Sequence, residues 1–294
     1  MGTTDHLTRR IVVGVNASPS SRAAVTRAAR QAQRRHCDLI IIHIDPVFVA
    51  PVPGHAAVTT SRSLLDTIAT AASSSQPTVP VTTLLLTGSV SEQLIKLSAN
   101  ALLLVIGIDE GRPRSDHGAL GAVEDRVVMH SDCPVVTVSG RCDRMGRLEH
   151  RVVVGWSDVP SSCRALQEAA AEAQRRQASL TIVIDTAHLT VISPGTMPAV
   201  ANSPAGLAQA VHSVRSAHPA VVIDVDSSVL DYPQGLISQT AGADLIVIGC
   251  PHSDDRWSIR VGITADTLMR QAACPVMFVG QVRVTPNPTG FVAA

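Results

Sequence analysis

The chain repeats itself in a fixed register. Three separate blocks return at one common offset of 141 in residue number, which chance similarity does not produce. The blocks and their copies are 11–21 and 152–162, 32–35 and 173–176, and 133–135 and 274–276. A duplicated unit in a chain of 294 residues predicts two domains of similar size. We expect these domains at residues 8–140 and 150–283, followed by a flexible tail at 284–294.

Composition excludes several classes of protein. Hydrophobic residues make up 45% of the chain and charged residues 16%, which is typical of a globular protein. Lys+Arg and Asp+Glu both number 24, so no net charge attracts nucleic acid or an anionic membrane. The longest apolar run, Ala101–Ile106, is far shorter than the roughly 20 residues of a membrane helix. Six cysteines without paired spacing argue against a disulfide framework, and we expect a cytoplasmic protein.

Each half alternates short apolar runs with Ala-rich stretches of helical period. The expected strands are 11–15, 39–44, 81–86, 102–107, 135–139, 152–156, 180–185, 221–225, 245–249 and 275–280. The expected helices are 20–35, 60–73, 90–100, 120–131, 161–177, 204–217, 234–242 and 262–272. Segments 46–60 and 186–205, rich in Pro, Gly, Ser and Thr, are expected to be long loops. Strand–helix alternation predicts an α/β fold with two tandem open parallel five-stranded sheets and helices on both faces.

In such sheets a ligand binds beyond the carboxyl ends of the strands. After the fourth strand of the first half come Gly107 and Gly111, and after a further spacer Gly121 and Ala122 stand at a helix start. Glycines there would let backbone approach a phosphate, which the N-terminus of a helix can hold. A plain turn between strand and helix explains the same residues.

These residues carry a resemblance to the universal stress protein family over nearly the whole of both halves. The marks are the opening strand with its Ser-Pro-Ser-Ser turn, the strand that runs into Gly107, the glycine loop, and the Cys-Pro step into the last strand. The resemblance implies strand order 3-2-1-4-5, dimerisation, and in some members ATP held by Gly-x2-Gly-x9-Gly-[Ser/Thr]. It also implies an Asp at the end of the first strand, and backbone at the end of the second strand, here Ile44, as contacts of adenosine.

The first half departs from that ATP motif. Three residues, not two, separate Gly107 from Gly111, whereas the nine-residue spacing to Gly121 is kept. Ala122 replaces the Ser or Thr, so one hydroxyl donor is lost. Asn16 stands at the Asp position and can hydrogen-bond a ribose hydroxyl without charge assistance.

The second half departs further. Gly249 and Gly262 fit the first and third glycines, while His252 and Ile263 replace the second glycine and the Ser or Thr. Ser157 stands at the Asp position. Gly107 and Gly249 are one position further apart than the copies in the other blocks, which indicates one extra residue in the loop of the first half. We therefore expect the first half to be the better candidate for a nucleotide.

These observations predict a regulatory adenine-nucleotide-binding protein of the stress response. The alternative is a scaffold that has lost its ligand and works through protein partners. ATP is the expected cofactor, and Asp109 with Glu110 could bind Mg²⁺ beside it. We expect no enzyme, because no catalytic signature occurs, and no metal site of the protein's own. The last strands are expected to pair within one chain as a pseudo-dimer, and a further homodimer stays open.

Overall fold

The computed structural model describes eight stretches of the chain, and the statements below concern these: 10–45, 56–109, 122–143, 150–157, 161–185, 204–227, 232–250 and 262–281. The elements of the first half are β1 (Arg10–Val15), α1 (Pro19–Arg35), β2 (Asp38–Asp45), α2 (Ala56–Ser75), β3 (Val81–Thr87), α3 (Val90–Ser98), β4 (Leu103–Ile108), α4 (Ala122–His130), β5 (Val135–Ser139) and the short 3₁₀ helix η1 (Gly140–Asp143). Those of the second are β6 (Arg151–Trp156), α5 (Ser162–Arg176), β7 (Ser179–Ile184), α6 (Pro204–Ala217), β8 (Ile223–Asp226), α7 (Tyr232–Gln239), β9 (Leu245–Gly249), α8 (Ile263–Gln271) and β10 (Val276–Val279).

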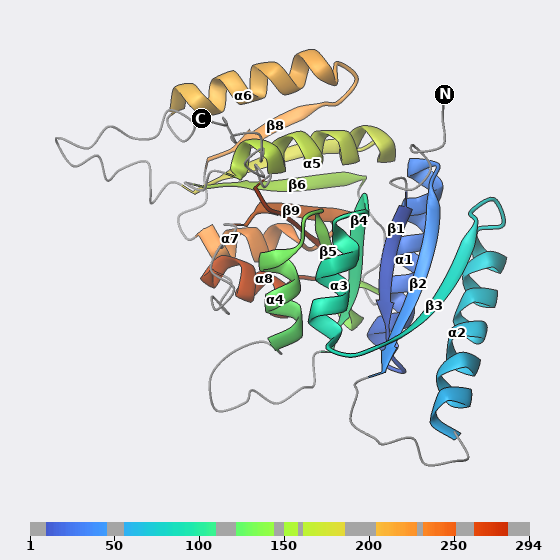
Figure 1. The fold of residues 1–294 in the computed structure, drawn as a ribbon. Helices are drawn as coiled ribbons and strands as arrows, with labels where there is room; N and C mark the ends of the chain where they lie inside the picture. The colour runs from blue at the N-terminus through green and yellow to red at the C-terminus, as the bar shows by residue number, and fades with distance from the viewer. Residues whose placement is uncertain are drawn as a thin grey trace, which may run out of the picture.

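The two halves form one continuous sheet of ten strands in the order β3-β2-β1-β4-β5-β10-β9-β6-β7-β8 (Figure 1). Within each half the strands are parallel and follow the predicted order 3-2-1-4-5. The halves meet where β5 and β10 pair antiparallel, from Val135↔Phe278 to Thr137↔Val276. The predicted pairing of the last strands is therefore confirmed, and it joins the two sheets edge to edge.

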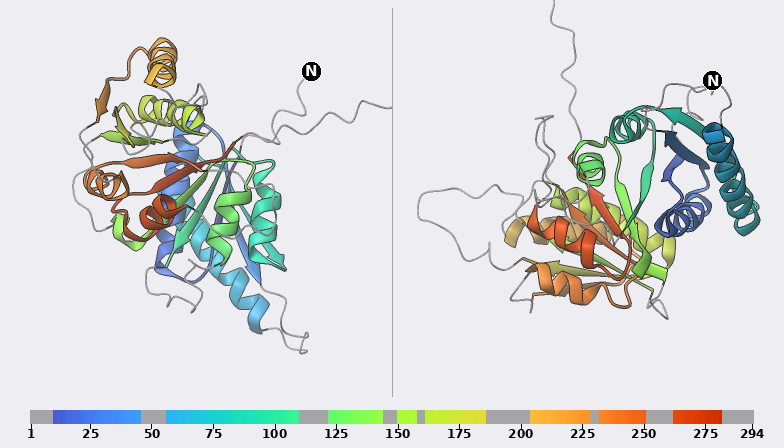
Figure 2. Two further views of the ribbon diagram at one scale, coloured as in Figure 1. Left: turned by 90° about the vertical axis from the view of Figure 1, so that its left-hand side faces the viewer. Right: turned by 90° about the horizontal axis from the view of Figure 1, so that it is seen from below.

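Helices cover both faces of the sheet (Figure 2). One hydrophobic core packs α1, α2, α5 and α6 against the sheet, and a second packs α3, α4, α7 and α8 against the opposite face. The chain has only 2% aromatic residues, so small side chains set the distance between layers. Ala24, Ala28, Ala29 and Ala32 of α1 are fully buried against the strands, as the period of 3.6 predicts.

Helix ends repeat in the same register as the sequence. Ser18 caps α1, its hydroxyl accepting from the backbone N–H of Ser21 at 3.3 Å, and Pro19 begins the helix as predicted. α1 ends at His36 and α5 at Gln177, both in the left-handed conformation with φ of 49° and 53°. This conformation usually needs glycine, so its return at the equivalent position of the second half shows how closely the two copies share a backbone.

Two sequence expectations need correction or fall outside the described residues. The loop expected at 46–60 is shorter, because α2 begins at Ala56; the prolines and glycine just before it masked the helical start. The tail at 284–294 lies outside the described residues. Among the helices that are described, none has the length and apolar character needed to cross a membrane.

Candidate functional site

The carboxyl ends of β1, β2 and β4 bring three predicted site residues to one edge of the sheet. β1 pairs with β2 up to Val15↔His43 and with β4 up to Gly14↔Ile106. Asn16, Ile44 and Gly107 follow directly on these pairs. β2 continues past the end of β1, so the backbone of Ile44 lies at this edge of the sheet although its side chain is buried.

Asn16 is exposed, and its side-chain oxygen is engaged. Oδ1 accepts from the backbone N–H of Ser18 at 2.9 Å and from the hydroxyl of Ser21 at 2.6 Å. The backbone N–H of Asn16 donates to Ser21 Oγ at 2.9 Å. These bonds fix the turn into α1, and within the described residues the amide nitrogen donates none of them. Asn16 can therefore donate to a ribose hydroxyl, where an Asp would accept from it.

Gly107 has a packing role that its sequence position did not reveal. A Cβ there would lie 2.7 Å from the carbonyl carbon of Ser20 and 2.8 Å from its oxygen, so only glycine lets α1 pack on β4. The hydroxyl of Ser20 also donates to Asp109 Oδ1 at 2.6 Å. Asp109 is thus tied to the first turn of α1. Close approach of a phosphate is not needed to explain Gly107.

A polar cluster that the sequence did not predict lies at the end of β2. His43 lies near the end of β2 and is half-buried. Its Nδ1 lies 2.8 Å from the carbonyl oxygen of Val15, and its Nε2 lies 3.0 Å from Asp45 Oδ1. The hydroxyl of Ser61 donates to the same Asp45 oxygen at 3.0 Å. The cluster joins the ends of β1 and β2 and places a carboxylate next to Ile44.

Several predicted residues cannot be placed. Gly111, Gly121, Glu110 and His252 lie outside the described residues. Ala122 is the first residue of α4, in the position predicted for the start of that helix. Within the described ranges, no group of three His, Cys, Asp or Glu residues is arranged to hold a metal ion.

In the second half the equivalent helix packs on the corresponding strand, but the polar contacts around it differ. A Cβ at Gly249 would lie 2.7 Å from Ser161 Oγ, so this glycine serves the packing of α5 on β9. Ser161 donates to the carbonyl oxygen of Cys250 at 3.0 Å, where Ser20 has a carboxylate as partner. Gly262 precedes α8 as its N-cap, and nothing lies within 4 Å of a Cβ built there. Protein packing therefore does not require glycine at 262.

Tyr232 packs against Gly155 near the carboxyl end of β6, and sequence reasoning missed it. Its side chain is 6% exposed, and its hydroxyl lies where a Cβ of Gly155 would be. The same hydroxyl hydrogen-bonds the side chain of Ser157, the residue at the Asp position. Burial is the main cause that raises the pKa of Tyr232 beyond its ordinary range, so the phenol stays neutral. The counterpart of Tyr232 at the start of α3 is Val90, which is too short to reach β1.

Strand register locates the extra residue of the first copy. Leu103 pairs with Ile11 and Leu245 pairs with Val152, so the offset between β4 and β9 is one greater than the offset between β1 and β6. β5 and β10 return to the common offset. The loop after β4 therefore carries one residue more than the loop after β9, as predicted from the glycines.

Cys133 and Cys274, the cysteines of the two Cys-Pro steps, are 8% and 4% exposed and precede β5 and β10. Burial raises the pKa of each thiol to about 12, so both stay protonated and inert.

Comparison with known proteins identifies the family. The model of the universal stress protein family matches twice, at residues 8–139 and 149–280. A universal stress protein of Mycolicibacterium smegmatis is 25% identical over 283 residues, covering 92% of this chain and 96% of the relative. Universal stress protein Rv1996 of Mycobacterium tuberculosis is 30% identical over 193 residues, and the match spans 60% of its length.

A solved structure agrees with the fold. The crystal structure of a universal stress protein from Archaeoglobus fulgidus superposes with a TM-score of 0.70 at 15% identity, covering 93% of this chain and 98% of that one. Two family matches in register with the two halves of one ten-stranded sheet leave no other assignment: the chain belongs to the universal stress protein family, with two such domains in tandem.

Proposed function

We propose that this protein binds an adenine nucleotide in its first half and acts as a regulatory, non-catalytic protein of the cytoplasmic stress response. The observation that carries the proposal is the hydrogen bonding of the Asn16 side chain. Its oxygen is engaged by Ser18 and Ser21 in an exposed turn at the end of β1, and within the described residues its amide nitrogen has no hydrogen-bond partner. A preset donor at this point suits a ribose hydroxyl.

The described residues fit the adenosine part of the nucleotide. Asn16 would hold the ribose and the backbone beyond His43, at Ile44, would border the base. The carboxylate of Asp109 stands at the start of the loop that would hold the phosphates, and it could hold Mg²⁺ that accompanies them. ATP supplies no chemistry in this proposal; its occupancy is the signal.

The second half acts as a structural partner in this proposal. Tyr232 packs against Gly155 and hydrogen-bonds Ser157, so the residue at the Asp position already has a partner within the protein. This observation favours, for that half alone, the alternative of a scaffold that works without a nucleotide.

Two experiments test the proposal. Protein purified without added nucleotide is denatured, and the released material is analysed for adenine nucleotides by chromatography. Asn16→Asp is then compared with wild type in titrations with ATP. One carboxylate oxygen would keep the turn while the other accepts the ribose hydroxyl, so affinity should rise about five- to tenfold. Absence of nucleotide together with an unchanged dissociation constant would refute the placement of the ribose.

A further inference from the structure

The two halves face each other across a pseudo-twofold axis. In the sheet, Val136 pairs with Met277, which is its own counterpart in the repeat. In the helical layer, Gln31 of α1 hydrogen-bonds Glu172 of α5, and these two positions are also counterparts, 141 apart in number. Residues that touch their own counterparts lie on the symmetry axis of a dimer-like interface. Positions 31 and 172 therefore mark the centre of the α1–α5 contact.

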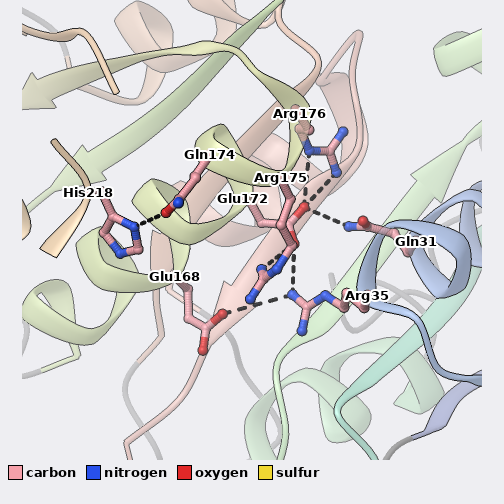
Figure 3. A network of polar contacts seen from close by, with 8 residues as sticks. All are labelled: Gln31, Arg35, Glu168, Glu172, Gln174, Arg175, Arg176 and His218. Atoms are coloured by element: carbon pink, nitrogen blue, oxygen red, sulfur yellow. Dashed lines mark hydrogen bonds and ion pairs between the residues drawn. The ribbon is translucent and has the colours of Figure 1, made fainter. Parts of the chain in front are cut away.

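Glu172 accepts hydrogen bonds from residues of both halves at this contact (Figure 3). Its side chain is fully buried. Oε1 accepts from Arg35 at 2.8 Å and from Arg175 at 2.9 Å. Oε2 accepts from Arg176 Nη2 and from Gln31 Nε2, both at 2.8 Å, and from Arg176 Nε at 3.0 Å. One carboxylate thus serves cations of both halves.

The charge on Glu172 is well defined by these partners. Burial alone would raise the pKa of Glu172, but Arg176, Arg35 and the amide of Gln31 outweigh burial and hold it well below its usual range. A buried carboxylate with this many donors stays ionised. The interface therefore depends on a negative charge that only the second half supplies.

Near the axis the arginines of the last helical turn occur in both copies, whereas the central carboxylate occurs in one. Arg34 and Arg35 are the counterparts of Arg175 and Arg176, whereas the counterpart of Glu172 is neutral Gln31. α1 contains five arginines and no acid, while α5 contains three arginines and two acids. Two first halves joined in this way would bury cations with no carboxylate between them. Two second halves would place two copies of Glu172 against each other on the axis.

The α1–α5 contact of the native protein already brings several positively charged arginines close together. Burial, followed by the repulsion of Arg176, lowers the pKa of Arg27 to about 10. Replacing α5 by a second α1 would add more arginines to this region and remove Glu172. Like charges without a partner in a buried interface oppose association.

We propose that the α1 surface of the first half is selective for a helix that carries a buried carboxylate on the axis, which makes the second half its partner and excludes a second first half. The first half therefore associates with the second half in preference to another first half. The selectivity comes from the position of a single carboxylate at 172.

Moving the carboxylate from position 172 to position 31 in the full chain tests this proposal. Glu172→Gln removes the shared carboxylate and should raise the equilibrium constant of unfolding roughly 100-fold or more in urea titrations. The double variant Gln31→Glu/Glu172→Gln moves the carboxylate to the other side of the axis. There Arg35 stands four residues on, as Arg176 does from Glu172, so most of the lost stability should return.

The matched control is Glu168→Gln. Glu168 contacts Arg35 at 3.9 Å with 28% of its side chain exposed, so the variant should change the unfolding constant by less than about fivefold. If the double variant is no more stable than Glu172→Gln, Glu172 acts only within its own helix, and the proposal is overturned.

A second measurement reads partner choice directly. A protease site is inserted within residues 144–149 of the full chain, the folded protein is cut, and native mass spectrometry records which halves remain together. The proposal expects first–second pairs only, with these pairs weakened by Glu172→Gln and restored by the double variant. Abundant first–first pairs, or complete dissociation of the cut wild-type protein, would overturn it.

Discussion

Gly107→Ala is expected to destabilise the protein through a clash that the chain cannot relieve by turning a side chain. The new Cβ would meet three backbone atoms of Ser20 and Ser21 at 2.7–2.8 Å. Favourable contacts between carbon atoms lie near 3.5–4.0 Å, so α1 and β4 have to separate by about 0.8 Å. Forced separation of packed elements costs about 1–3 kcal/mol of unfolding free energy.

Displacement of α1 also reaches the candidate site. Ser20 holds Asp109, and the next residue, Ser21, holds Asn16. Gly107→Ala should therefore weaken nucleotide binding as well as lower stability.

The assay is urea unfolding followed by circular dichroism, with thermal melting as a second readout. Each kcal/mol corresponds to a fall of about 2–4 °C in melting temperature. Gly262→Ala is the matched control, because nothing lies within 4 Å of the added Cβ and φ is −60°. This control should stay within about 0.5 kcal/mol of wild type. Equal stability of the two variants would refute the packing role of Gly107.

Two further predictions concern buried side chains. Burial and the nearby Asp266 raise the pKa of Asp125 to about 7 from an ordinary value of 3.8, so between about pH 4 and 7 the folded state holds a proton that the unfolded state releases. Stability should fall as pH rises through this window, and Asp125→Asn should reduce the slope by up to about 1.4 kcal/mol per pH unit in urea titrations; identical slopes would contradict this. Gly155→Ala should cost about 1–3 kcal/mol in wild type and clearly less when combined with Tyr232→Phe, which removes the contacted hydroxyl. Gly14→Ala is the counterpart, where a Cβ would meet the side chains of Leu94 at 3.3 Å and Ile106 at 3.8 Å, and it should cost less than Gly155→Ala. Additive effects of Gly155→Ala and Tyr232→Phe would argue against the contact between Gly155 and the Tyr232 hydroxyl.

The fold was predictable because its signals are local. β-branched runs covered on both faces and Ala-rich helices mark each element, and the observed bounds mostly lie close to those expected. The glycines after the fourth strands also gave the correct relative spacing of the two copies. At Ala56 the local signal was ambiguous, because the helix α2 begins within a segment that has the composition of a loop.

The site was less predictable because it depends on contacts between distant segments. Tyr232 lies far from Gly155 along the chain, with α5, β7, α6 and β8 between them, and only the fold brings them together. A signal was present, since an aromatic residue replaces Val90 at the same point of the repeat. Glu172 gave a similar signal: it replaces Gln31 directly before the block Ala-Gln-Arg-Arg that both helices share. A difference between two copies of one unit marks where their roles have diverged.

The stoichiometry of ATP binding tests the central claim most directly. Isothermal titration of the full chain, freed of bound nucleotide, should give one site per chain, because Ser157, at the Asp position of the second half, already has Tyr232 as its partner. Gly111→Arg should abolish this site, whereas Gly262→Arg in the second half should leave it intact. One site that is lost only with Gly111→Arg is the result that we predict; two sites, no binding at millimolar ATP, or loss with Gly262→Arg alone would contradict the assignment of the nucleotide to the first half.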